Sequence, residues 1–138
     1  MNAIDVTGDI KYQKFFKKIK SVADFTLKYF KVKNRSLSVY IVDDKKNSQL
    51  KRQFLKNDKS KATVLSFPFP SNFPHPETKF SPLGEIFLSQ KLFLKKDWPK
   101  FLIHGILHLL GYDHIKKNDM IKMTELEREL WEKIISQL

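Results

Sequence analysis

Residues 97–114 read DWPKFLIHGILHLLGYDH, and this stretch decides how the rest of the chain is arranged. Asp97 is a good candidate for a helix N-cap, and Pro99 suits the first turn, where its missing N–H costs nothing. We therefore expect a helix that runs from there to about Leu110, where Gly111 can end it. Apolar residues cover nearly every face of this helix, so it should be buried, with other elements packed around it.

Three of the four histidines of the chain lie in this stretch, at positions 104, 108 and 114. His104 and His108 are four residues apart, so both imidazoles should project from one face of the helix, roughly 6 Å apart along its axis. Gly111 allows a tight turn after the helix, so that His114 can fold back as a third nitrogen ligand. Two histidines buried without partners in an aliphatic helix would be costly, which favours a metal site over ordinary core histidines.

Three imidazole ligands suit one Zn²⁺ ion per chain in a catalytic site, because the fourth tetrahedral position stays open for water. Such a water has a pKa near ~7 and can supply hydroxide at neutral pH. A closed structural site would need a fourth ligand, and the remaining histidine, His75, is better explained as a solvated loop residue. The chain has no cysteine, which excludes disulfide scaffolds, Cys-ligated zinc and thiol nucleophiles.

The histidine spacing matches the metzincin peptidase pattern H-E-x-x-H-x-x-G-x-x-H except at Gly105, where those peptidases have glutamate. That glutamate accepts the proton of the attacking water and passes it to the leaving amine, which glycine cannot do. A peptidase would need a base from elsewhere, such as Glu85. A phosphodiester is anionic and is attracted to an uncompensated cation, so it is the better substrate class for this site.

The positive charge of the chain is concentrated in its N-terminal half. Residues 1–61 hold sixteen basic and six acidic side chains, a net +10, whereas residues 62–138 hold ten and nine, a net +1. A one-sided basic field is expected of a protein that binds nucleic acid or another polyanion. The alternative is a solvated basic face that only keeps the protein soluble. Charge and metal site together favour a phosphodiester substrate.

Periodicity elsewhere predicts a single α+β domain over residues 1–138. Helical spacing predicts an amphipathic helix at 11–32 with lysines outside, a short basic helix at 47–55 and a last helix at 118–136; alternation predicts strands at 36–42, 62–67 and 83–89. Prolines between 68 and 76 indicate an extended surface loop. The last helix should have an acidic outer face and turn six apolar residues inward: Met120, Ile121, Leu126, Leu130, Trp131 and Ile134.

Neither an export signal nor a membrane span is predicted. Asp5 and Asp9 stand where a secretory signal would have basic residues before an apolar stretch. The longest nearly apolar run, 101–112, is too short to cross a bilayer and contains two histidines. The sequence therefore predicts a cytoplasmic protein.

With HGILHLLGYDH at 104–114, ATVLSFPFP at 62–70 and PLGEIFLS at 82–89, the chain resembles the YbeY endoribonuclease family. The resemblance implies a zincin-like α+β fold, in which a small mixed β-sheet packs with helices. It also implies cleavage of single-stranded RNA, processing of ribosomal RNA that includes the ends of 16S rRNA, and quality control of the small ribosomal subunit. His104, His108 and His114 match the family's metal ligands, and Ser66 would line the active-site groove.

Two positions depart from the family pattern. A Tyr-Arg pair usually precedes the V-L-S-F-P strand, and its Arg is thought to hold an RNA phosphate; the corresponding pair here is Phe54-Leu55. Glu85 stands where the family tends to have Asp, a change that keeps a carboxylate near the sheet. Basic residues close to the missing Arg are candidates for RNA binding, although a lysine would not reproduce a bidentate guanidinium clamp: Arg52, Lys56, Lys59 and Lys61.

The leading hypothesis is a zinc-dependent endoribonuclease in which metal-bound water attacks a phosphate of single-stranded RNA. No general base is identified. Asp113 is a candidate for orienting the imidazole of a ligand; the alternative is that it is an exposed carboxylate in the turn. A second hypothesis is a ribosome-associated RNA-binding protein whose metal only braces the fold. A zinc peptidase is the third.

Overall fold

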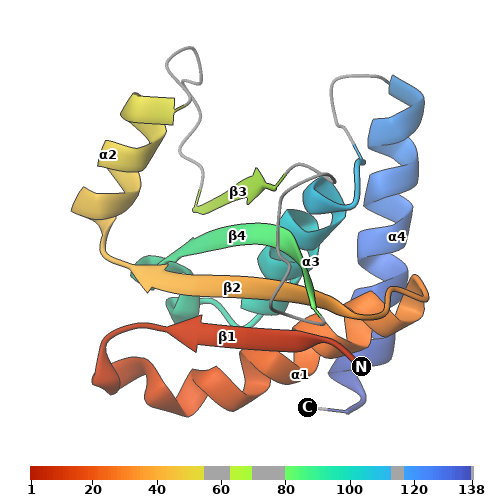
Figure 1. Ribbon diagram of the computed structural model, residues 1–138, viewed down its shortest axis with the longest axis horizontal. Helices are drawn as coiled ribbons and strands as arrows, with labels where there is room; N and C mark the ends of the chain where they lie inside the picture. The colour runs from red at the N-terminus through yellow and green to blue at the C-terminus, as the bar shows by residue number, and fades with distance from the viewer. Residues whose placement is uncertain (55–62, 70–79, 113–116, 138) are drawn as a thin grey trace.

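The computed structural model of the chain describes residues 1–54, 63–69, 80–112 and 117–137 (Figure 1). Within these ranges, no helix has both the length and the apolar composition that crossing a bilayer requires. The elements in chain order are β1 (Ala3–Thr7), the short 3₁₀ helix η1 (Ile10–Tyr12), α1 (Gln13–Tyr29), β2 (Arg35–Val42), α2 (Asp44–Phe54), β3 (Val64–Pro68), β4 (Ser81–Ser89), the 3₁₀ helix η2 (Gln90–Leu94), α3 (Trp98–Leu109) and α4 (Lys117–Ile135).

Four strands form one mixed sheet in the order β1-β2-β4-β3. The strands β1, β2 and β4 are parallel, whereas β3 runs antiparallel to β4 at the edge. Pro68 ends β3, a position that an edge strand tolerates because one of its sides needs no ladder hydrogen bonds. The predicted α+β class and mixed sheet are confirmed, and so are the three predicted strands, with small shifts of their ends. The edge strand β1 was not predicted.

The helix α3 lies at the centre of the packing, as predicted. It contacts β3 and β4 on one side, and α1 and α4 on others (Figure 1). Its apolar residues Leu102, Ile103, Ile106 and Leu107 are all fully buried. On the sheet side, the core contains alternate residues of β2 and β4: Leu37, Val39, Ile86 and Leu88. The buried stripe of α1 completes it: Ile19, Val22, Ala23 and Leu27.

Both ends of α3 lie where the sequence predicts them. Asp97 occupies the predicted N-cap position, although its side chain makes no capping hydrogen bond. Gly111 has a φ of +99°, a conformation that favours glycine. Its N–H donates to the carbonyl of His108 over 3.0 Å, and the N–H of Tyr112 donates to the carbonyl of Leu107 over 3.0 Å. The chain therefore leaves the helix directly after the histidines.

The predicted inward face of α4 needs one correction. Its buried stripe is formed by Met123, Leu130 and Ile134, whereas Met120 and Ile121 are 45% and 48% exposed. At 3.6 residues per turn, Ile121 projects roughly opposite to Met123 and Leu130, so it cannot share their face, and the stripe begins later than predicted. Residues 70–79, which include most of the predicted proline-rich loop, lie outside the described residues.

Candidate metal centre

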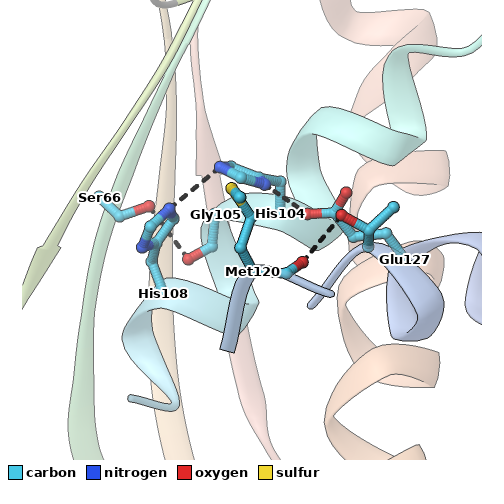
Figure 2. Close-up of polar contacts among 7 residues, drawn as sticks. Ser66, His104, Gly105, His108, Met120 and Glu127 are labelled. Atoms are coloured by element: carbon cyan, nitrogen blue, oxygen red, sulfur yellow. Dashed lines mark hydrogen bonds and ion pairs between the residues drawn. The ribbon is translucent and has the colours of Figure 1, made fainter. Parts of the chain in front are cut away.

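The pair His104 and His108 shares one face of α3, as their spacing predicts. Their Nε2 atoms face each other at 3.0 Å, and their ring centroids are 4.6 Å apart with the ring planes at 77° (Figure 2). Because the two residues are one turn apart on a buried and therefore well-held helix, this geometry follows from α3 itself. The pair forms the beginning of a nitrogen-rich site on an otherwise aliphatic helix.

The other ring nitrogen of His104 is held by a carboxylate. Nδ1 of His104 contacts Oε1 of Glu127, which reaches across from α4 (Figure 2). A carboxylate can only accept a hydrogen bond, so a neutral imidazole in this contact would carry its proton on Nδ1 and its lone pair on Nε2. The two side chains are partly buried, with 34% of His104 and 24% of Glu127 exposed.

The spacing of the two Nε2 atoms fits a shared zinc ion. Two nitrogen ligands of a tetrahedral zinc, each ~2.0–2.1 Å from the metal, are roughly 3.3 Å apart, close to the observed 3.0 Å. Among the described residues no group of three potential ligands is found, and His114 lies outside them, as does Asp113. The described part of the site therefore offers two converging imidazole ligands, and the predicted third remains a prediction.

A close contact with the edge strand β3 holds the turn of α3 that carries His104 and His108. The hydroxyl of Ser66 in β3 donates to the carbonyl of Gly105 over 3.0 Å (Figure 2). A Cβ added at Gly105 would lie 3.0 Å from that hydroxyl oxygen, 3.1 Å from Cγ2 of Val64 and 3.3 Å from Cδ1 of Ile86. Residue 105 thus faces the sheet, where even a Cβ would require its neighbours to move, and Ser66 lies beside the histidines.

Glu85 does not reach the histidine pair. It is paired with Phe67 in β3 and with Ser38 in β2, at a strand position that alternates with the α3-facing Ile86. Its side chain therefore lies on the opposite face of the sheet, where it contacts Tyr40. Burial raises the pKa of Tyr40, and the negative charge of Glu85 raises it further.

Phe54, the first residue of the pair that replaces the family's Tyr-Arg, lies on that opposite face. Phe54, at the end of α2, is 57% exposed and packs edge-on against Phe67, with ring centroids 5.4 Å apart. Arg52 is exposed on the same helix. Leu55 and three of the candidate RNA-binding lysines, Lys56, Lys59 and Lys61, lie outside the described residues, as does His75.

Sequence reasoning missed Glu127 as a member of the site. It lies in the last helix, which has several other acidic residues, and its residue type does not separate it from exposed neighbours such as Glu125. Only the packing of α4 on α3 brings it to His104, across 23 residues of sequence. The single available signal was its spacing on the helix, since Glu127 lies on the stripe that contains the buried residues Met123 and Leu130.

Comparison with known proteins gives a consistent result over nearly the whole chain. A family model described as Endoribonuclease YbeY matches residues 2–135. A relative with that description from Aquifex aeolicus is 34% identical, and the match covers 88% of this chain and 82% of the relative. Another from Mycoplasmopsis pulmonis is 29% identical, and the match covers 97% of each chain.

A solved structure agrees with the arrangement of the elements. The solution structure of a Thermotoga maritima protein matches with a TM-score of 0.55 and 25% sequence identity, and the match covers 97% of this chain and 93% of that one. The match therefore spans nearly the whole chain, α3 and α4 included.

Proposed function

Because this chain belongs to the Endoribonuclease YbeY family and is therefore a nuclease that hydrolyses phosphodiester bonds in RNA, we propose that it uses one Zn²⁺ ion to cut single-stranded RNA. Its substrate would be ribosomal RNA, including the ends of 16S rRNA, and it would act with the small ribosomal subunit in maturation and quality control. The observation that carries the metal requirement is the convergence of two imidazole Nε2 atoms at 3.0 Å on the buried helix α3.

The metal would be held by His104 and His108, with His114 as the third ligand. A bound zinc ion would supply Lewis acidity toward the phosphate and a water acidic enough to attack at neutral pH. The protein itself contributes the direction of the two nitrogens, which α3 fixes through its buried residues and through its contact with β3. No carboxylate base is assigned to the attack.

The surroundings of the histidines disfavour a peptidase. At position 105 the helix meets Ser66 and Val64 so closely that a catalytic glutamate could not be accommodated there. The substitute base considered from the sequence, Glu85, lies on the opposite face of the sheet. A phosphodiester needs no proton delivery to an amine, so cleavage of RNA is consistent with both observations.

The basic N-terminal half supports RNA as the partner. The lysines of α1 lie on its exposed side, as predicted, while Ile19, Val22 and Leu27 are buried. Exposed Lys and Arg side chains bind the phosphate backbone without reading bases, and this binding weakens as salt increases. We propose that Arg52 and the lysines that follow it take part in this contact. The absence of cysteine agrees with a reducing, cytoplasmic setting.

The proposal is tested by cleavage of single-stranded and double-stranded RNA by chelator-treated protein, before and after zinc is added. Zinc should restore cleavage of the single strand in the unaltered protein but not in the variant His108→Ala. Cleavage by that variant at the normal rate, or cleavage without any metal, would reject a zinc nuclease. RNA binding without turnover by the zinc-loaded protein would instead favour the RNA-binding hypothesis, in which metal only braces the fold.

The ribosomal role is tested separately in cells from which the protein is depleted. Precursors of 16S rRNA with unprocessed ends should accumulate, and expression of the unaltered protein should remove them. Expression of the His108→Ala variant should not. Normal 16S ends in depleted cells would contradict the role in rRNA maturation while leaving RNA cleavage by the purified protein unaffected.

A further inference from the structure

We propose that Glu127 is a positioning residue that selects the tautomer and the orientation of His104 for metal binding. The inference rests on the proposed zinc site, and it adds to that site a residue from a different helix. The observation that supports it is the contact between Oε1 of Glu127 and Nδ1 of His104, on the side of the ring that points away from His108 (Figure 2).

The contact determines which ring nitrogen is available to a metal. A neutral imidazole carries its proton on one nitrogen and a lone pair on the other. Because the carboxylate of Glu127 accepts the Nδ1 proton, the lone pair of His104 lies on Nε2, the atom that faces Nε2 of His108 at 3.0 Å. Without Glu127, the ring could adopt the other tautomer, with its proton in the space where the ion would bind.

The contact also fixes the direction of the ring. An imidazole on a helix can rotate about its side-chain bonds unless its far nitrogen is held. Glu127 is itself held, because Met123 and Leu130, four residues before it and three after it on α4, are 2% and 0% exposed. The carboxylate therefore belongs to a packed helix face, which is how a supporting group keeps a ligand in place.

Partial burial makes this contact more than an ordinary surface ion pair. Only 24% of Glu127 and 34% of His104 is exposed, whereas the pair Lys28–Asp24 on α1 is 67% and 36% exposed. Water competes less for a hydrogen bond in the less exposed position. Other glutamates of α4, such as Glu125 and Glu132, are exposed.

The closing experiment compares Glu127→Ala and Glu127→Gln with Glu125→Ala, a matched change on an exposed residue of the same helix. Zinc affinity is measured by competition with a chelating indicator. Removal of a group that orients a metal-bound histidine lowers metal affinity by about 10- to 100-fold. We expect that loss for Glu127→Ala, a smaller loss for Glu127→Gln, whose amide oxygen can still accept from Nδ1, and none for Glu125→Ala.

A second measurement separates positioning from general support of the fold. In metal-free protein labelled with ¹⁵N-histidine, long-range ¹H–¹⁵N spectra report which ring nitrogen carries the proton. The unaltered protein should show His104 protonated at Nδ1, and Glu127→Ala should show a mixture of tautomers while its circular dichroism is unchanged. A Glu127→Gln variant that folds normally keeps the test decisive if the alanine variant does not fold.

The outcomes distinguish this inference from the proposed function. If the unaltered protein binds no zinc, the proposed metal site is wrong. If it binds zinc and Glu127→Ala binds it equally tightly with the same His104 tautomer, the metal site stands and the role of Glu127 is overturned. Partial recovery of affinity in Glu127→Gln, with the Nδ1-protonated tautomer, supports the role assigned here.

Discussion

The hydroxyl of Ser66 donates to the backbone carbonyl of Gly105 over 3.0 Å, and so joins the edge strand β3 to the turn of α3 between the two histidines. The absence of a side chain at residue 105 favours this contact, since a Cβ there would lie 3.0 Å from the same hydroxyl oxygen and would require a neighbour to move. Two residues from separate segments thus hold the turn that carries the histidines against the sheet. A substitution at either Ser66 or Gly105 should therefore change the stability of the fold.

Ser66→Ala should lower the free energy of unfolding by about 1 kcal/mol, because it removes one partly buried hydrogen bond. Denaturant unfolding of the metal-free protein measures this loss. The matched control is Ser136→Ala, which removes a hydroxyl-to-carbonyl hydrogen bond to Lys133 at an exposed position and should have a smaller effect. Equal losses in the two variants would show that the bond to Gly105 contributes nothing beyond an ordinary surface contact.

Gly105→Glu would restore the peptidase pattern in the sequence but should unfold the site instead of creating a peptidase. The new side chain would point at Val64, Ile86 and Ser66, so we expect a destabilisation of at least about 3 kcal/mol from overpacking and from a buried charge. Gly105→Ala adds only a Cβ and should cost less. Thermal unfolding and a peptide-cleavage assay check both; a stable Gly105→Glu variant that cuts peptides would contradict the geometry.

Glu85→Gln should leave RNA cleavage unchanged and should lower the pKa of Tyr40. Burial and the charge of Glu85 both raise that pKa above its ordinary value, and the substitution removes the second cause. Ultraviolet titration of phenolate absorbance, with Tyr40→Phe used to identify the signal, measures the shift. A lost RNase activity with an unchanged Tyr40 titration would place Glu85 in catalysis after all.

The raised pKa of Tyr40 also predicts how the free energy of unfolding changes at alkaline pH. Tyr40 has a higher pKa in the folded than in the unfolded protein, so the folded state binds its proton more tightly. Its contribution to stability is complete below the ordinary tyrosine pKa of ~10 and is lost as the pH rises through the folded value. Tyr40→Phe should therefore flatten the alkaline decline of the free energy of unfolding.

Local pattern predicted the parts of this fold that depend on neighbours in sequence. The ends of α3, its burial and the shared face of His104 and His108 follow from periodicity and from Gly111 alone. The strand β1 was missed because it has five residues and becomes a strand only by pairing with β2, where Val6 meets Val39. A parallel edge strand carries little signal of its own.

The parts of the site that could not be predicted depend on which element packs on which. Alternation places Glu85 and Ile86 on opposite faces of β4 but does not tell which face meets α3. The contact between Glu127 and His104 requires α4 to lie across α3 in one register. The family resemblance predicts the ligands from their motif, whereas the carboxylate that contacts His104 was visible only in three dimensions.

Zinc should stabilise the fold through the histidines of the 104–114 motif. A ligand that binds only the folded state adds about 2.7 kcal/mol to its stability when present at a hundred times its dissociation constant. Differential scanning calorimetry of chelator-treated protein, with and without zinc, should show the increase in the unaltered protein and in His75→Ala, and its loss in His108→Ala.

The His75→Ala variant tests the prediction that the fourth histidine is no ligand; loss of the zinc effect in His75→Ala would indicate a closed, structural site. Because α3 is held in the core by fully buried residues such as Leu102, Ile103 and Ile106, the metal-free protein should remain folded, and the effect should be a shift in melting temperature rather than a transition from disorder.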